Sequence, residues 1–306
     1  MTKKLNDYSF TIITPAYNTA KYIENNIKAI INSKYDLNKI EHIIVDDGST
    51  DNTYQIVKKY ANKYPHIKLY KKPNSNWGGV MNYIRKNKLV HNDYVTINDS
   101  DDVIMPKALF YVNKYSHNED LIFGNFYKWN GKHINILAQS YYYAFKRVAS
   151  SKNNIKIPPF IWMSHGVYFK KNTFYQIHDL KEHVPYQDNV LMAELFNHAN
   201  SIRYINKCLE KYFESRPNNS SNFIKDEKSI LLLSENAKVL EKNNLVDPLA
   251  TILIYFKRLR KYCKKHKIVF KFKQKPKFKN VNPLMRLLVY MTYYFSGANK
   301  FIKIVR

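Results

Sequence analysis

The chain contains few of the residues that define several protein classes. Its 306 residues include only 2 cysteines, 7 glycines and 11 prolines. Cys208 and Cys263 are too few for a disulfide framework, and neither has the partner spacing of a metal site. The low glycine and proline content excludes collagen-like and flexible low-complexity sequence. These absences favour a globular protein of a reducing compartment.

Long apolar runs are also missing. The first seven residues lack the apolar core of a secretion signal. Near the C-terminus the longest apolar run, residues 287–295, is too short to span a bilayer. We therefore expect a cytoplasmic protein, either free or attached peripherally to the inner face of the cell membrane.

Acidic residues are absent from the last fifth of the chain. Residues 251–306 hold 16 lysines and arginines and no aspartate or glutamate, although the whole chain has a net charge of +26. The first 250 residues carry 34 basic and 24 acidic groups, an ordinary surplus for an enzyme with anionic substrates.

What the sequence does contain is an alternation of apolar and amphipathic segments. Strands are predicted at 10–14, 41–45, 67–70 and 94–97, and helices at 19–33, at 53–64 and from a Gly-Gly turn at 78–79 to about residue 88. Pro15 is expected to end the first strand. This alternation predicts an α/β fold with a mostly parallel sheet and flanking helices.

Polar clusters follow three of these strands. They are Pro15-Ala16-Tyr17-Asn18, Asp46-Asp47-Gly48 and Asn98-Asp99-Ser100-Asp101-Asp102. Ligands bind at the carboxyl ends of parallel strands, so the three clusters predict one site. Two carboxylates at i and i+2, Asp99 and Asp101, can share a hard divalent cation and the phosphates it carries. The alternative is a solvated acidic turn in which Asp102 caps a helix before Pro106.

In order and spacing, these clusters resemble the family 2 glycosyltransferases with the GT-A fold, over roughly the first 110 residues. Asn76-Trp77-Gly78-Gly79-Val80 is similar to the family's Asn-Gly-Gly loop, although Arg85 lies one place from the usual arginine and receives no role. The resemblance implies a nucleotide-sugar donor and Mn²⁺ or Mg²⁺ as cofactor. It implies these roles: Pro15, Tyr17, Asp46 and Asp47 at the nucleobase, Asp99 at the ribose or sugar, Asp101 at the metal, and Gly78 and Ser100 elsewhere in the donor site.

The second half of the chain is less regular. A strand is predicted at 121–126 and a helix at 141–151. By the resemblance, residues 160–169 line the acceptor and the donor sugar. His165 in that segment is predicted to contact the donor, with a structural histidine as the alternative.

Two further residues complete the predicted site. Pro185-Tyr186-Gln187-Asp188 resembles the family's Glu-Asp segment at the start of a helix, with glutamine in place of the common glutamate. This implies that Asp188 is the general base of an inverting transfer, and a helix N-terminal acid is the alternative. Tyr212 and Arg216 loosely resemble the family's Tyr-x-x-Arg-x-x-Ser motif, although here the arginine comes four residues after the tyrosine. The resemblance implies that Arg216 clamps the diphosphate, and a surface arginine is the alternative.

The function that follows is transfer of a sugar, most simply from a UDP-sugar, to a hydroxyl of a cell-surface glycan or a lipid-linked acceptor, in cell-wall, capsule or exopolysaccharide assembly. Two alternatives stand beside it. A sugar-phosphate nucleotidyltransferase shares the sheet and acidic site, but it would want a glycine-rich basic loop where Pro15-Ala16-Tyr17-Asn18 stands. A non-catalytic nucleic-acid-binding protein would use the basic tail.

The predicted domains are a GT-A catalytic domain at 1–225 and a helical, basic region at 226–306. In that region basic faces lie opposite leucine and aromatic faces, a pattern typical of binding to an anionic membrane surface. The same stripes suit a packed appendage, contact with the acceptor or a homo-oligomer interface. Nucleic acid is the least favoured partner.

Overall fold

A computed structural model describes residues 6–130, 134–137, 148–149 and 164–214 of the chain. Its strands are β1 (Phe10–Ala16), β2 (Ile40–Asp46), β3 (Ile67–Lys71), β4 (Tyr94–Ile97), β5 (Val103–Ile104), β6 (Leu121–Trp129), β7 (Ile134–Leu137), β8 (Val148–Ala149), β9 (Val167–Lys170) and β10 (Ile202–Phe213). Its helices are α1 (Ile23–Ile31), α2 (Thr53–Lys63), α3 (Asn76–Lys86), α4 (Ala108–Tyr115), α5 (Lys171–Gln176) and α6 (Gln187–His198), with a short 3₁₀ turn, η1, at Leu37–Lys39.

One mixed sheet forms the centre of this part of the molecule. The strand order is β3-β2-β1-β4-β9-β6-β10-β5, with β7 added beside β6 and β8 beside β10. Strands β1 to β4 pair in parallel, as predicted, and β10 is parallel to β6. Strand β9 runs antiparallel to both of its neighbours, β4 and β6. The predicted α/β class is confirmed.

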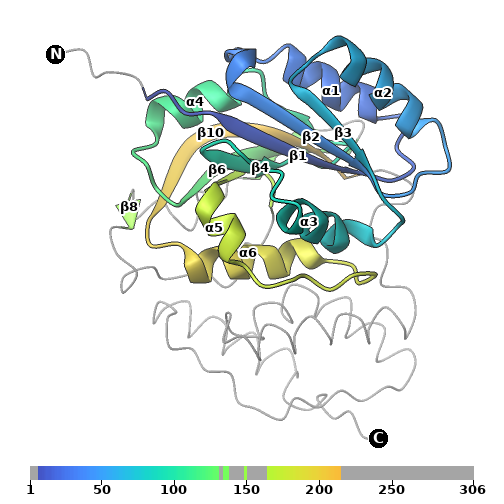
Figure 1. The fold of residues 1–306 in the computed structure, drawn as a ribbon. Helices are drawn as coiled ribbons and strands as arrows, with labels where there is room; N and C mark the ends of the chain where they lie inside the picture. The colour runs from blue at the N-terminus through green and yellow to red at the C-terminus, as the bar shows by residue number, and fades with distance from the viewer. Residues whose placement is uncertain (1–5, 131–133, 138–147, 150–163, 215–306) are drawn as a thin grey trace, which may run out of the picture. The chain divides into compact units, whose positions relative to one another are not determined.

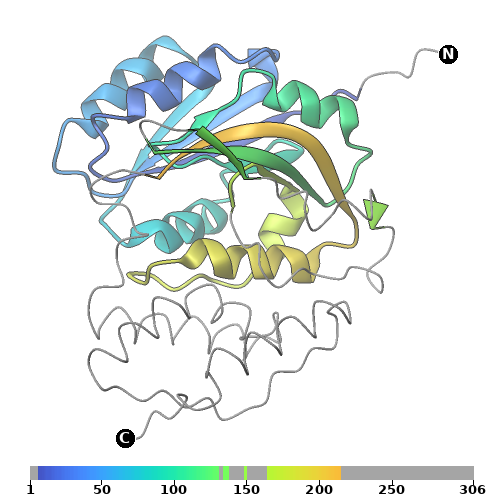
Figure 2. The same cartoon turned by 180° about the vertical axis from the view of Figure 1, so that it is seen from behind.

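Helices cover both faces of the sheet. Figures 1 and 2 show α1, α2 and α4 on one face and α3, α5 and α6 on the other. On the first face, isoleucines at helical spacing on α1 (Ile23, Ile27, Ile30) are fully buried, and two of them pack with Ile44 of β2 and Val57 of α2. This burial of an amphipathic stripe holds the helix against the sheet, because apolar area leaves water.

Three details differ from the sequence-based expectation. Pro15 lies within β1, which continues to Ala16, because a proline near the strand end removes only one ladder donor. Gly78 and Gly79 lie inside α3 rather than in a turn. Within the helix predicted at 141–151, the described residues Val148 and Ala149 form a strand instead, because they pair with β10.

Other expectations fall partly or wholly outside the described residues. Residues 226–306 and Arg216 are among these, so the second domain and the diphosphate clamp stay predictions. Among the helices in the described ranges, none has the length and apolar character needed to cross a bilayer.

Candidate donor-binding and catalytic site

The loops that follow β1, β2 and β3 meet at one edge of the sheet. Ala16 is in register with Asp46, and Asp46 with Lys71. Two hydrogen bonds connect the loops beyond the strands: Asp47 N–H donates to Ala16 O over 2.8 Å, and Thr50 N–H donates to Asn18 Oδ1 over 2.8 Å. The two polar clusters that follow β1 and β2 therefore meet in the structure, as predicted.

The residues predicted to contact the nucleobase lie at the ends of β1 and β2 and in the loops that follow them. Tyr17 is 48% exposed, an unusual fraction for a large ring, and Pro15 is half-buried beside it. Asp46 is fully buried, and its Oδ1 accepts from Ser49 N–H over 3.2 Å. This bond holds the loop that follows β2, and the buried Oδ2 of Asp46 has no hydrogen-bond partner within the described part of the chain.

Asp47 forms a small charged cluster with residues after β3. Lys72 Nζ lies 2.5 Å from Asp47 Oδ1, and Ser75 N–H donates to the same oxygen over 3.0 Å. Burial raises the pKa of Asp47, and the hydrogen bonds from Lys72 and Ser75 oppose this rise. Asp47 also accepts at the start of α3, because Ser75 is the residue before that helix.

The acidic segment after β4 is a closed turn. Asp102 N–H donates to Asp99 O over 2.8 Å, and Ser100 is buried within the turn. Asn26, buried on α1, donates its amide to the carbonyls of Asp99 and Asp102, each over 3.0 Å. The turn is therefore rigidly held, with the half-buried side chains of Asp99 and Asp101 at the sheet edge.

Asp102 does not cap a helix. Helix α4 begins later, at Ala108, and Asp102 is almost completely buried. Its Oδ1 accepts from Phe213 N–H over 2.8 Å, and its Oδ2 lies 3.3 Å from His165 Nδ1. Asp102 thus connects the acidic turn to the end of β10 and to His165.

His165 is buried between two carboxyl groups. Its Nδ1 lies 3.1 Å from Glu210 Oε1, in addition to the contact with Asp102. Glu210 Oε2 accepts from Gly166 N–H over 2.7 Å, and the ring of Tyr212 stacks on the imidazole at 4.3 Å. Burial alone lowers the pKa of His165, but the hydrogen bond and charge of Glu210, with the charge of Asp102, raise it to about 10. His165 is therefore held as an imidazolium.

Asp188 lies in the first turn of α6. Tyr186, the residue before the helix, has φ 60°, a left-handed conformation that is costly for an aromatic residue and sets the direction in which the helix begins. Burial raises the pKa of Asp188 to about 6, the negative charge of Asp99 adds to the rise, and the positive charge of His165 opposes it. The charges of Asp99 and His165 therefore both act on the carboxyl group of Asp188.

The charges at this site suit a divalent cation. The pKa of Asp102 is raised well above its ordinary value, mainly by burial and then by the charges of Asp101, Glu210 and Asp99. Carboxylate oxygens are the ligands that Mg²⁺ and Mn²⁺ prefer, and excess negative charge is what such an ion would offset. The residues present therefore fit the predicted metal.

Several residues of the site were not found from the sequence. Trp77 donates its indole N–H to Asp99 Oδ1 over 3.0 Å, and Lys72 and Glu210 pair with Asp47 and His165. Lys72 follows a parallel strand, so the strand-end argument could have found it. No pattern marks Glu210, because it is one acid in a long strand.

Gly78 contacts the approach to α6. A Cβ added to Gly78 would lie 2.6 Å from the backbone oxygen of Lys181, so only glycine allows α3 to pack this closely against the segment that leads to Asp188. Nearby, Gln187 Oε1 accepts from Lys181 N–H over 2.9 Å, a bond that the common glutamate could also accept.

Together, a largely parallel α/β sheet and a carboxylate-rich edge define the GT-A class of nucleotide-dependent proteins. The chain belongs to the family described as Glycosyl transferase family 2, whose family model matches residues 11–177. It is therefore a glycosyltransferase.

Named relatives agree with this assignment. The chain is 30% identical over 273 residues to the uncharacterized glycosyltransferase MG025 of Mycoplasma genitalium, covering 89% of this chain and 90% of the relative. It is 29% identical over 147 residues to the minor teichoic acid biosynthesis protein GgaA of Bacillus subtilis, covering 47% of this chain and 30% of GgaA. The fold resembles that of S. aureus TarS 1-349 in complex with UDP-GlcNAc, with a TM-score of 0.60, 24% identity and coverage of 75% of this chain and 65% of TarS.

Proposed function

We propose that this glycosyltransferase moves a sugar, with inversion, from a UDP-sugar to a hydroxyl of a cell-surface glycan or lipid-linked acceptor. The observation that carries the proposal is the acidic turn at the sheet edge, where Trp77 donates to Asp99 and Asp102 contacts His165. The charges of Asp99 and His165 both act on the carboxyl group of Asp188. Transfer to a hydroxyl requires a carboxylate that can take up a proton near neutral pH, together with acidic side chains that can hold a cation at the leaving diphosphate.

The nucleotide would bind across the edge formed by β1, β2 and β4. The exposed ring of Tyr17 and the half-buried ring of Pro15 offer an apolar surface on which a nucleobase can stack. Asp47 and Lys72 supply a polar boundary to that surface. Uridine is the base we favour because the structurally similar TarS was solved with UDP-GlcNAc.

The diphosphate and its cation would lie at the acidic turn. Asp101, with Asp99, would hold Mn²⁺ or Mg²⁺, and the bound cation would offset the charge that develops on the leaving diphosphate. The indole of Trp77 fixes one oxygen of Asp99, which leaves the other for the ribose, the sugar or the metal. The imidazolium of His165 supplies a further positive charge to the same region.

Asp188 would act as the general base. Its carboxylate takes the proton of the acceptor hydroxyl while the hydroxyl oxygen bonds to the anomeric carbon and the bond from that carbon to the diphosphate oxygen breaks. A pKa of about 6 leaves most of Asp188 ionised at neutral pH while keeping it a competent base. Attack from the face opposite the leaving diphosphate inverts the configuration of the anomeric carbon.

The acceptor follows from chemistry and similarity. GgaA, which is similar over 47% of this chain, is a minor teichoic acid biosynthesis protein, which supports a cell-surface polymer or its lipid-linked precursor as the acceptor. The basic residues at 251–306 would suit an anionic membrane surface or an anionic acceptor, and the region can equally contact a second copy of the chain.

Hydrolysis of a panel of UDP-sugars with Mn²⁺ tests the proposal. We expect slow cleavage of one sugar by the wild-type chain and by Asp7→Asn, a control for loss of an exposed carboxylate. Asp101→Ala is expected to lose cleavage and metal-dependent UDP binding together. Cleavage that survives in Asp101→Ala would contradict the metal site. Binding of none of the UDP-sugars would contradict the uridine assignment.

A further inference from the structure

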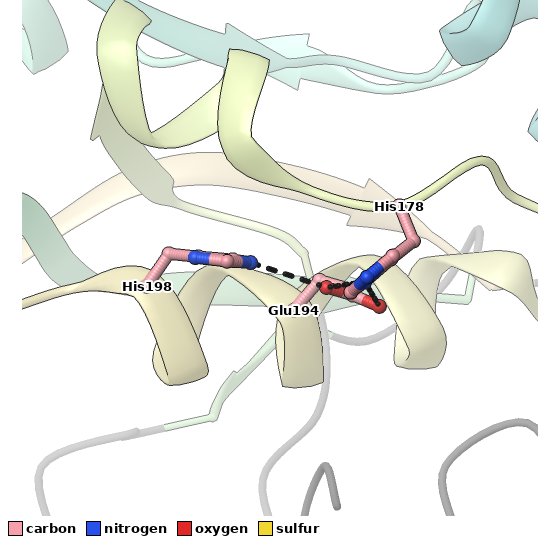
Figure 3. A group of neighbouring side chains, drawn as sticks. All are labelled: His178, Glu194 and His198. Carbon is pink, nitrogen blue, oxygen red and sulfur yellow. Dashed lines mark hydrogen bonds and ion pairs between the residues drawn. The ribbon is translucent and has the colours of Figure 1, made fainter. Parts of the chain in front are cut away.

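A second group of metal-ligating side chains lies at the opposite end of α6 from Asp188. It consists of His178, Glu194 and His198, and we call it the histidine cluster (Figure 3). We propose that the histidine cluster is a binding site for Zn²⁺, and that the ion connects α6 to the segment at 177–186.

The geometry of the three side chains supports coordination of a single ion. Each offers one donor atom, and these atoms lie within 4.8 Å of one another. His178 Nδ1 lies 2.9 Å from Glu194 Oε1, and His198 Nε2 lies 3.5 Å from Glu194 Oε2. Donor atoms about 2 Å from a zinc ion stand at comparable separations, so small side-chain rotations would complete the site.

Burial gives the cluster a reason to take up a cation. Glu194 is 1% exposed, and both of its carboxylate oxygens lie within 3.1 Å of His178 Nδ1, so a buried negative charge already stands between the two imidazoles. The buried Nε2 of His198 has no hydrogen-bond partner among the described residues, although it faces this carboxylate, as Figure 3 shows. A metal ion would use the lone pair of that nitrogen and the charge of the carboxylate together.

Local structure presents the ligands with little freedom. Glu194 and His198 are spaced i, i+4 on α6, which places both side chains on one face of the helix. Arg85 donates to the backbone oxygens of Ile177 and His178, so the third ligand is also fixed in place. His198 lies in the last turn of α6, where the helix dipole favours a cation.

The ligand set distinguishes this site from the acidic turn. Two imidazoles and one carboxylate are the ligands of zinc, whereas the all-oxygen set of Asp99 and Asp101 suits Mg²⁺ or Mn²⁺. His178 is 62% exposed on its side chain, so a fourth position is open to water. The site therefore binds zinc without taking part in the transfer itself.

Because α6 begins at Asp188 and ends at the cluster, the ion would stabilise the helix that carries the proposed base. Zinc binds the folded chain only, so it raises the melting temperature as its concentration rises above the dissociation constant. The chemistry at Asp188 does not depend on the ion, and failure of the zinc proposal leaves the proposed transfer unaffected.

The experiment uses the full chain carrying Asp101→Asn, which removes the metal ligand of the acidic turn. After treatment with EDTA and removal of the chelator, Zn²⁺ is titrated by calorimetry and Co²⁺ by its visible absorption. We expect one ion per chain with a micromolar or tighter dissociation constant. Affinity should fall by about 10- to 100-fold or more in His178→Asn and in His198→Asn, because each removes a ligand.

His91→Asn is the matched control, since His91 is exposed and distant in sequence from the cluster. It should bind zinc as the parent does. His178→Asn changes a largely exposed side chain, so it remains informative if His198→Asn fails to fold. Absence of zinc binding by the parent would overturn the proposal, and so would equal binding by His178→Asn and His91→Asn, which would place the ion among the other histidines and cysteines.

Discussion

Glu210 lies 3.1 Å from the imidazole of His165, and 45 positions separate the two residues in the chain. The pair is buried and contacts Asp102, so it joins β10, the start of β9 and the acidic turn. Removing one charge of such a pair leaves the other charge buried without its partner. The pair therefore couples the stability of the fold to the geometry of the site.

We expect Glu210→Gln to lower the free energy of unfolding by about 3 kcal/mol, the usual cost of breaking a buried ion pair by removing one partner. Urea denaturation at pH 7 measures the change. Glu214→Gln is the control, because Glu214 pairs with Lys128 in a more exposed setting and its loss is expected to cost less than about 1 kcal/mol. Equal effects of the two substitutions would contradict the assignment.

The same pair predicts how stability depends on pH. The pKa of His165 is about 10 in the folded chain and near 6.5 in the unfolded chain, so the folded state binds the proton more tightly. The contribution of the protonated imidazole to the free energy of unfolding is complete below about pH 6.5 and is lost as the pH rises toward 10. Urea denaturation across this window should show falling stability in the wild type and a flatter profile in His165→Asn.

Asp188→Asn is expected to lower kcat for transfer by about 10²- to 10⁴-fold, because the amide cannot accept the proton of the acceptor hydroxyl. Donor affinity, measured by UDP titration, should change little. In the wild type, kcat/KM should fall about tenfold per pH unit below a midpoint near 6, or lower if a bound cation opposes the charge of Asp99. A residual activity in Asp188→Asn with an unchanged acid limb would exclude Asp188 as the base.

Trp77→Phe removes the hydrogen bond to Asp99 while keeping an aromatic ring. We expect the affinity for a UDP-sugar to fall by about tenfold, since a hydrogen bond to a charged group contributes about 1.5 kcal/mol or more. Calorimetric titration with and without Mn²⁺ would measure it. If affinity is unchanged, Asp99 does not depend on the indole for its orientation.

Gly78→Ala introduces a Cβ 2.6 Å from the backbone oxygen of Lys181, and backbone cannot move aside as a flexible side chain can. We expect a loss of stability of about 1–3 kcal/mol, together with reduced kcat as the start of α6 shifts. Gln55→Ala, on the exposed face of α2, controls for substitution by alanine in a helix. Retention of wild-type stability and kcat would show that the segment around Lys181 moves to admit the added Cβ at little cost in free energy.

Local sequence determined the first half of the fold. Apolar runs defined β1 to β4, and isoleucines at helical spacing defined the buried face of α1. The predicted parallel order then assigned the carboxylates of the acidic turn to the same sheet edge as Asp46 and Asp47, because carboxyl ends of parallel strands share an edge. The family resemblance added Asp188, which periodicity could identify only as a helix N-terminal acid.

Only the tertiary structure decided which charges pair. Asp102 follows residues that form a turn, and nothing nearby in sequence indicates that it contacts His165 and the end of β10. Glu210 and Trp77 reach the site from elements whose patterns report burial and not partners. The histidine cluster likewise needs the segment after α5 to fold back on α6. Periodicity records which face of an element avoids water, whereas charge pairing depends on distances between elements that only the assembled sheet brings together.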